Sequence, residues 1–241
     1  MGRPAAASDP RSFDRFAIDY DRYAGSEPRL VHDWLLAQLP GHGRRALDAG
    51  CGSGRHTLAL ADRFDEVVGI DVSRPLIDLA RRQRPHARLR YRVQDLMAIT
   101  DPHRFDLVLS STTLHHLADL EAALRRLRGL VANGGTAILI DNVAPRPTPP
   151  GWVYRLGAVH ELPADLRRLG WEQAWWVLKF RTSRAWLDHL ASDRYLSRQQ
   201  FEQRYGAIFP GARFHALGYA HALIWHNPAL PPAIAQHAPS S

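Results

Sequence analysis

The stretch ALDAGCGSGRHT, residues 46–57, decides the fold of this 241-residue chain. A short apolar run leads to Asp48, and three glycines follow at alternate positions, Gly50, Gly52 and Gly54. A helical pattern begins directly after the last glycine. The order strand, glycine loop, helix is typical of sites where the backbone approaches a ligand, because glycine has no Cβ and tolerates sharp turns. The free N–H groups at the start of the helix are expected to point toward that ligand.

The spacing of the glycines argues against two common nucleotide-binding loops. A dinucleotide-binding fold needs G-x-G-x-x-G, and Arg55 occupies the position of the third glycine when the pattern starts at Gly50. A P-loop ends in Gly-Lys followed by Ser or Thr, and no lysine is near. The pattern D-x-G-x-G-x-G, which begins at Asp48 and encloses Cys51, resembles motif I of the class I S-adenosylmethionine (SAM)-dependent methyltransferases. The alternative is a loop that only turns the chain.

Composition bounds the class of protein. The chain is 45% hydrophobic and 23% charged, which is ordinary for a globular protein, and its length suits one domain with an elaboration. No apolar run approaches the roughly 20 residues that span a bilayer, and the N-terminus lacks the apolar segment of a signal peptide. The single cysteine, Cys51, excludes an internal disulfide and a cysteine-built zinc site. We therefore expect a cytoplasmic protein without a metal ligand set.

The charge of the chain is basic, with a formal net charge of +7 and a pI of about 10.1. Such a balance can indicate a nucleic-acid or membrane partner. However, Lys179 is the only lysine, and the arginines are scattered from Arg3 to Arg213 rather than gathered in one run. Scattered arginine together with much alanine and proline reflects a GC-rich genome more often than a partner, so we do not expect nucleic acid to be bound.

Strand and helix patterns alternate through the first two thirds of the chain, which indicates a mostly parallel α/β sheet. Helical spacing also marks the N-terminal segments from residue 12 and over 27–39. Strands are predicted at 45–49, 66–71, 89–93, 105–110 and 136–141, and helices at 56–64, 73–82 and 117–131. Ser73 is a plausible N-cap, and Asn133, Gly134 and Gly135 are expected to end the helix over 117–131, because they tolerate left-handed geometry.

The segment 144–196 interrupts this alternation and holds five of the seven tryptophans. We expect it to form a helical lid inserted after the fifth strand. Ser197 and Gln200 then predict a capping box for a helix to about residue 209, and two closing strands follow at 212–217 and 221–226. Residues 1–11 are expected to be disordered, residues 12–227 to form the methyltransferase domain, and residues 228–241 to be loose.

The candidate site residues follow the strand ends, because open parallel sheets bind ligands at the carboxyl ends of their strands. Asp71 and Val72 end the second strand, and an acid there can accept from both ribose hydroxyls. The third strand ends in Gln94, Asp95 and Leu96, and the fourth in Ser110 and Ser111. The run LHHLAD at residues 114–119 then resembles the ubiquinone/menaquinone-biosynthesis type of small-molecule methyltransferase. The resemblance covers residues 44–143 and not the tryptophan-rich insert.

The resemblance implies a Rossmann-like, seven-stranded sheet whose last strand is antiparallel, with SAM as cofactor and S-adenosylhomocysteine as product. In the family, an acid at the position of Asp95 reads the adenine amino group, and residues near His115 border the methionine part. An aromatic ring at Tyr20 would stack on the sulfonium, and Arg55 would pair with the cofactor carboxylate. The expected cofactor-binding residues are Tyr20, Asp48, Gly50, Cys51, Gly52, Gly54, Arg55, Asp71, Val72, Gln94, Asp95, Leu96, Ser110, Ser111 and His115.

Methyl transfer is an in-line displacement on an already activated carbon, so positioning of the nucleophile is the main task of the enzyme. A general base is needed only where the nucleophile carries a proton. We predict His115 and Asp141 as the catalytic residues, with His116 and His160 as weaker candidates, because His115 and Asp141 follow the fourth and fifth strands.

The tryptophans of the lid favour a small, apolar or aromatic organic acceptor, methylated at O, N or C. Two alternatives stay open at this stage. A peptide or RNA methyltransferase would use the arginine-rich surface, and a methyltransferase-like protein would bind SAM without transferring its methyl group, as a cyclase or a binding subunit.

Overall fold

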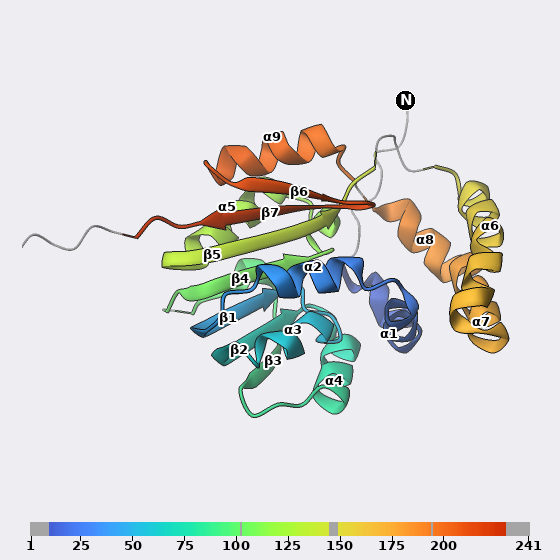
Figure 1. The fold of residues 1–241 in the computed structure, drawn as a ribbon, viewed down its shortest axis with the longest axis horizontal. Helices are drawn as coiled ribbons and strands as arrows, with labels where there is room; N and C mark the ends of the chain where they lie inside the picture. Colours follow the sequence, from blue (N-terminus) through green and yellow to red (C-terminus); the bar gives the residue numbers. More distant parts are fainter. Residues whose placement is uncertain (1–9, 102, 145–148, 194, 230–241) are drawn as a thin grey trace, which may run out of the picture.

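Seven strands form one sheet at the centre of the computed structural model, which describes residues 10–101, 103–144, 149–193 and 195–229 (Figure 1). The strands are ordered β3-β2-β1-β4-β5-β7-β6. The first five are parallel, and β7 is antiparallel to both of its neighbours. The predicted seven-stranded, mostly parallel sheet with an antiparallel last strand is therefore confirmed. Their bounds are β1 Gly43–Ala49, β2 Phe64–Asp71, β3 Leu89–Val93, β4 Phe105–Ser111, β5 Val131–Asn142, β6 Arg213–Leu217 and β7 Ala220–His226.

Helices cover both faces of this sheet. Three of them, α2 (Leu30–Gln38), α3 (Arg55–Leu60) and α4 (Arg74–Gln83), contribute to the apolar core on one face. The other core is built with α5 (Leu120–Leu130) and α9 (Arg198–Ile208). Neighbouring residues of the central strands face opposite cores, as Ala46 and Leu47 do, because side chains alternate along a strand. Burial on both faces explains why these strands read as continuous apolar runs.

The remaining helices lie beyond the carboxyl ends of the parallel strands, at the right of Figure 1. They are the N-terminal helix α1 (Ala17–Ser26) and the three helices between β5 and α9. These three are α6 (Gly151–Leu169), α7 (Trp171–Thr182) and α8 (Arg184–Ser192), and we call them the lid. Short 3₁₀ turns stand at η1 (Pro10–Arg15), η2 (Leu96–Ala98) and η3 (Leu114–His116). No helix among the described residues is both long and apolar enough to cross a membrane.

Helix caps follow the sequence closely. The Ser73 hydroxyl accepts from the backbone N–H of Leu76 at the start of α4, and Ser197 and Gln200 form the complete capping box of α9. Both caps were predicted, because a short polar side chain satisfies N–H groups that lack partners within the helix. The predicted disorder of residues 1–11 and 228–241 concerns segments that lie largely outside the described residues.

The helix predicted over 117–131 is shorter than expected at both ends. Its first turn begins at Leu120, because the Asp119 carboxylate accepts from the N–H of Ala122 and fixes the cap there. It ends at Leu130, and Asn133, Gly134 and Gly135 lie inside β5 instead of ending the helix. The left-handed geometry expected of this run is present at Gly134, at φ 77°, but it serves a register shift between β4 and β5.

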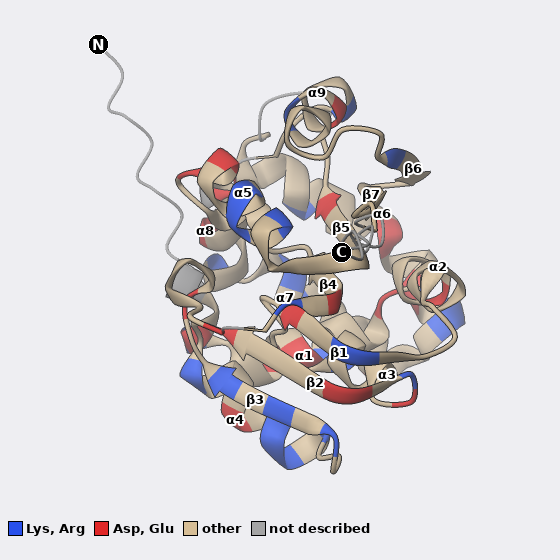
Figure 2. Cartoon of the chain, turned by 90° about the vertical axis from the view of Figure 1, so that its left-hand side faces the viewer, with Lys and Arg blue, Asp and Glu red and all other residues tan. Residues whose placement is uncertain are grey.

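The charges do not form one continuous basic stripe. Figure 2 shows Lys and Arg on β3 and α4, and Asp and Glu on the neighbouring β2, so basic and acidic segments alternate across this face. Several of these arginines take part in ion pairs with nearby acids, such as Arg45 with Glu66 and Arg81 with Asp78. This distribution agrees with the scattered arginines of the sequence.

A buried arginine ties the lid to the N-terminal helix. The Arg181 side chain on α7 is 12% exposed and donates to Glu27 just after α1, at 2.8 Å. It also donates to two acids of α6, Asp165 at 2.9 Å and Glu161 at 2.6 Å. One guanidinium therefore joins three helices, and its burial makes each pair stronger than a surface ion pair.

We predict that Arg181→Met lowers the free energy of unfolding by about 3 kcal/mol, because it leaves partly buried carboxylates without their cation. Arg184→Met is the matched control, since the Arg184 side chain is 93% exposed and pairs with its helix neighbour Asp188 at 3.6 Å. Urea unfolding of the two variants measures the difference. Equal stabilities would show that Arg181 does not anchor the lid.

Candidate active site

The glycine loop adopts the geometry that its sequence requires. Gly50, Gly52 and Gly54 have φ angles of 78°, 51° and 82°, a region that residues with a Cβ rarely adopt. At Gly50 a Cβ would also lie 2.2 Å from the side chain of Thr113, just after β4. The loop is thus held against the end of β4 at the point where the strand order reverses, which is where open α/β sheets bind their ligands.

Two acids support the loop from beneath and from the side. Asp48 is 2% exposed and accepts the Thr57 hydroxyl hydrogen bond at 2.6 Å. Burial raises the pKa of Asp48 to about 7. Asp71, at the end of β2, accepts from the N–H of Gly52 at 2.9 Å and from the N–H of Ser73 at 2.8 Å. Burial raises the pKa of Asp71 although these two hydrogen bonds oppose it.

Several predicted contacts prove to be packed into the framework around the loop. The Cys51 thiol is buried, which raises its pKa well above the usual value. The Ser110 hydroxyl donates to the carbonyl of Ala49 at 2.8 Å, and Ser111 beside it is buried. Val72 is half-buried next to Asp71. The Ser110 hydrogen bond joins the ends of β1 and β4, and the contact of these residues with a cofactor stays a prediction.

Arg55 is held by an acid of the N-terminal helix, and its expected pairing with the cofactor carboxylate stays a prediction. Its Nε donates to Asp21 of α1 at 2.9 Å, and Arg84 donates to the same carboxylate at 3.0 Å. The Ser53 hydroxyl also donates to Asp21, at 2.6 Å. Asp21 therefore fastens α1 to the glycine loop, a contact that sequence reasoning missed. The only local signal is that Asp21 lies in the Y-D-x-Y run, one residue after Tyr20.

Aromatic rings from the N-terminal segment and the lid cover the strand ends. Tyr20 lies 4.6 Å from Phe13 and 6.1 Å from Trp186 of α8, measured between ring centroids. Burial, with a smaller contribution from the nearby Asp71 charge, raises the pKa of Tyr20 to about 12. The Ser73 hydroxyl donates to Asp14 of η1 at 2.5 Å, which draws the same segment over the end of β2. Tyr20 thus lies among these aromatic rings, and its stacking on a sulfonium stays a prediction.

The end of β3 differs from the other strand ends. Leu96 is buried in the core, whereas Asp95 is exposed and accepts from the N–H of Met97 at 2.8 Å, which caps η2. The Gln94 amide donates to the carbonyl of Ala98 at 3.2 Å and lines a separate hollow. The backbone N–H of Gln94 donates to the carbonyl of Asp71 at 2.9 Å, so the end of β3 lies beside the end of β2.

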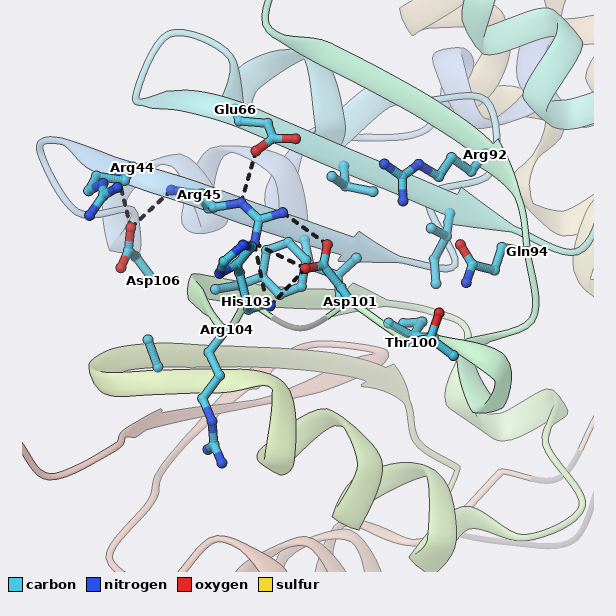
Figure 3. Close-up of a pocket in the computed structure, with 16 residues that line it drawn as sticks. Arg44, Arg45, Glu66, Arg92, Gln94, Thr100, Asp101, His103, Arg104 and Asp106 are labelled. Carbon is cyan, nitrogen blue, oxygen red and sulfur yellow. Dashed lines mark hydrogen bonds and ion pairs between the residues drawn. The ribbon is translucent and has the colours of Figure 1, made fainter.

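This hollow, with a volume of about 830 Å³, lies along one face of the sheet (Figure 3). Its charges are largely paired with each other, since Arg45 donates to Glu66 at 2.8 Å and to Asp101 at 2.9 Å. It has no left-handed loop and lies away from the glycines. We therefore place the active site at the carboxyl ends of the strands, in spite of the size of this hollow.

The two predicted catalytic residues are in contact. His115 of η3 is 8% exposed, and its Nδ1 shares a short hydrogen bond with Asp141 Oδ1 at the end of β5. The other Asp141 oxygen accepts from the Tyr205 hydroxyl at 3.2 Å. Burial lowers the pKa of His115, but the charges of Asp141 and Asp193 outweigh this effect and raise it overall. Because Asp141 engages Nδ1, the Nε2 atom of His115 faces the lid.

Sequence reasoning missed the lid's part of this centre. Asp193, just after α8, lies 4.0 Å from His115 Nε2, 3.2 Å from His116 Nδ1 and 3.9 Å from His189 Nε2. Burial lowers the pKa of His189 to about 4. His189 and Asp193 are four residues apart on one helix face, but nothing in the sequence pairs them with His115. The weaker candidate His160 is exposed on α6.

The residues present fit SAM. Left-handed glycines leave the loop backbone bare of side chains, which suits the close approach of a ligand. A carboxylate has about four acceptor positions, and the Asp71 carboxylate uses two of them on Gly52 and Ser73, so acceptors remain for ribose hydroxyls. The aromatic cover at Tyr20 suits a sulfonium cation.

Comparisons with known proteins agree with this geometry. A family model described as "Methyltransferase domain" matches residues 47–139. An uncharacterized methyltransferase of Mycobacterium tuberculosis is 30% identical over 208 residues, which cover 83% of this chain and 95% of that protein. The chain belongs to the class I SAM-dependent methyltransferases. It is an enzyme that uses SAM and yields S-adenosylhomocysteine.

Two further similarities concern the sequence and the fold of this methyltransferase. A ubiquinone biosynthesis O-methyltransferase of Coxiella burnetii is 33% identical over 105 residues, 42% of this chain and 45% of that protein. The DhpI complex with S-adenosylhomocysteine superposes with a TM-score of 0.64 at 18% identity, over 95% of this chain and all of that one. The latter similarity shows the shared fold.

Asp48 gives the methyltransferase a pH-dependent stability. Its pKa is about 7 in the folded chain against 3.8 for an exposed aspartate, so the folded state binds the proton more tightly than the unfolded one. Stability from this group is complete below about pH 4 and is lost as the pH rises toward about 7.

Asp48→Asn keeps the acceptor for Thr57 without the charge. We expect the free energy of unfolding of this variant, relative to that of the wild type, to rise by a few kcal/mol between pH 4.5 and pH 8. The rise is on the order of 1.4 kcal/mol per pKa unit. Urea unfolding at both pH values measures the gap, and a gap independent of pH would contradict the assignment.

Proposed function

We propose that this enzyme methylates a small, apolar or aromatic organic acceptor that binds beneath the lid beside His115. The observation that supports this most directly is the buried group of His115, Asp141 and Asp193, whose side chains are each at most 5% exposed. Polar groups are buried at this density mainly where they bind or react, because their desolvation is costly.

The walls around this group favour an apolar ligand. Phe13 packs against His116 and His189, with ring centroids 5.5 and 4.4 Å away, and Trp186 lies 5.2 Å from His189. Small-molecule sites typically combine such apolar walls with a few convergent polar groups. An extended RNA or peptide would need an open groove lined by charges, whereas Arg181 of the lid and Arg55 beside α1 are engaged in ion pairs with Glu27 and Asp21.

In this proposal the enzyme works mainly by alignment. SAM supplies a methyl group that is already activated by its sulfonium charge. The acceptor lone pair forms the new bond to the methyl carbon while the carbon–sulfur bond breaks, and the electron pair of that bond stays on sulfur. Asp71 and the glycine loop hold the nucleoside part, and Tyr20 covers the sulfonium. Asp141 positions His115 so that its Nε2 meets the reacting group of the acceptor.

Three further residues keep their expected cofactor-binding roles in this proposal. Asp95 and Gln94 are assigned to the adenine, and Arg55 to the cofactor carboxylate, which requires Arg55 to release Asp21 when SAM binds. We also propose a cytoplasmic location, which agrees with the single cysteine of the sequence.

The experiment is an acceptor screen that measures S-adenosylhomocysteine. With the best small acceptor, we expect His115→Ala to lower kcat/KM by roughly 100-fold or more, because the group that meets the acceptor is lost. His160→Ala, exposed on α6, is the matched control and should keep full activity. A His115→Ala enzyme within a few-fold of the wild type would overturn the assignment, and methylation of peptide or RNA alone would overturn the small-acceptor proposal.

A further inference from the structure

We propose that His115, His116 and Asp193 bind a divalent transition-metal ion, and that this ion binds the hydroxyl oxygen of the acceptor. The inference deepens the proposed function and rests on it for the acceptor: the Nε2 atom of His115 then meets the reacting group of the acceptor through the ion. It also departs from the expectation, drawn from the sequence, that the site has no metal. The two histidines come from η3, and Asp193 follows α8 in the lid. Asp193 is therefore far from the two histidines in the sequence.

The positions of the ligand atoms suit one ion. One ligand atom from each of the three residues lies within 4.8 Å of the other two, and all three residues are buried. Metal–ligand distances of about 2.0–2.2 Å place ligand atoms about 3.3–3.6 Å apart in a tetrahedral site. His116 Nδ1 is 3.2 Å from Asp193 Oδ1, and His115 Nε2 is 4.0 Å from Asp193 Oδ2. Small side-chain rotations are sufficient to close the set.

The groups around the ligands hold them as metal ligands are usually held. The His115 ring shares its Nδ1 proton with Asp141, which presents Nε2 to the ion, and Asp141 is itself fixed by Tyr205. The Tyr195 hydroxyl donates to Asp193 Oδ2 at 2.5 Å. A carboxylate behind a ligating histidine sets its tautomer and orientation, and such partners are a regular feature of metal sites. These contacts therefore give the cluster a second layer of support.

The donor types indicate which ion would bind. Two imidazoles and one carboxylate suit zinc, cobalt, iron or manganese better than magnesium or calcium, which prefer oxygen ligands alone. Three protein ligands leave a tetrahedral position open, as in catalytic zinc sites. The aromatic rings of Phe13 and Trp186 both pack against His189, which lies beside Asp193.

The open position gives the ion a role in methyl transfer. An acceptor hydroxyl bound there loses its proton to a water or buffer base, because the positive charge stabilises the oxyanion. The oxyanion then forms the carbon–oxygen bond as the carbon–sulfur bond of SAM breaks, with the electron pair left on sulfur. No electron is exchanged with the ion. The acceptor class that fits is therefore an apolar or aromatic hydroxyl compound.

Metal binding is tested on the full chain without a histidine tag, after removal of metal with a chelator. We expect one equivalent of Zn²⁺ by titration calorimetry, and visible absorption bands of tetrahedral Co²⁺ when Co²⁺ is used instead. Asp193→Asn and His116→Gln should each weaken binding at least 100-fold. His32→Gln is the matched control, because His32 lies 3.3 Å from His56 in a second close histidine pair. Circular dichroism checks that each variant is folded.

The proposal is overturned if the wild type takes up no stoichiometric ion, or if Asp193→Asn and His116→Gln bind Zn²⁺ as the wild type does. It is also overturned if binding is lost in His32→Gln instead. Activity separates this failure from that of the proposed function. Metal-free enzyme that methylates a small acceptor at the full rate removes the ion and keeps the proposed function. Stoichiometric Zn²⁺ at these ligands without methylation of any small acceptor removes the proposed function and leaves the ion site standing.

Discussion

The hydrogen bonds that Asp71 accepts from Gly52 and Ser73 are the contacts on which the site depends. They join the end of β2 to the glycine loop after β1 and to the cap of α4. A buried carboxylate is costly unless such donors surround it, so the loop and the acid stabilise one another. The left-handed glycines shape the loop that brings Gly52 to Asp71. A side chain at Gly50 would disturb this loop, because its Cβ would collide with Thr113. Cofactor binding thus rests on a preformed frame.

A second set of buried charges places the lid on that frame. Asp21 fastens α1 to the loop through Arg55, Arg84 and Ser53, and Arg181 fastens α7 to the end of α1. The N-terminal segment is therefore a shared support for the loop and the lid. Through it, His189 and Asp193 are brought against His115, although the lid follows β5 in sequence. Methyl transfer by positioning requires this kind of rigid, continuous support.

The sequence was sufficient wherever a local pattern determines the structure. The structure confirms the alternation of apolar strands with helices and the caps at Ser73 and Ser197. It also confirms the loop geometry expected from the glycine spacing. Each of these patterns acts over a few residues. Contacts between distant segments were not predictable in this way: the hydrogen bond of Arg55 with Asp21 joins residues 34 positions apart in the chain. Gly134 was read as a helix end because its left-handed geometry is the same in a strand irregularity. The partnership of Asp193 with His115 depends on how the lid folds back, and no periodicity encodes it.

The central claim is that SAM binds at the carboxyl ends of the strands and not in the larger hollow of Figure 3. The most direct measurement is calorimetric binding of S-adenosylhomocysteine to the wild type, Asp71→Ala and Asp101→Ala. Asp101 pairs with Arg45 in the hollow at 2.9 Å and serves as the matched acid. The account predicts that Asp71→Ala loses binding by roughly two orders of magnitude, about 2.7 kcal/mol, while Asp101→Ala binds as the wild type does. Loss of binding in Asp101→Ala with binding retained in Asp71→Ala would contradict it.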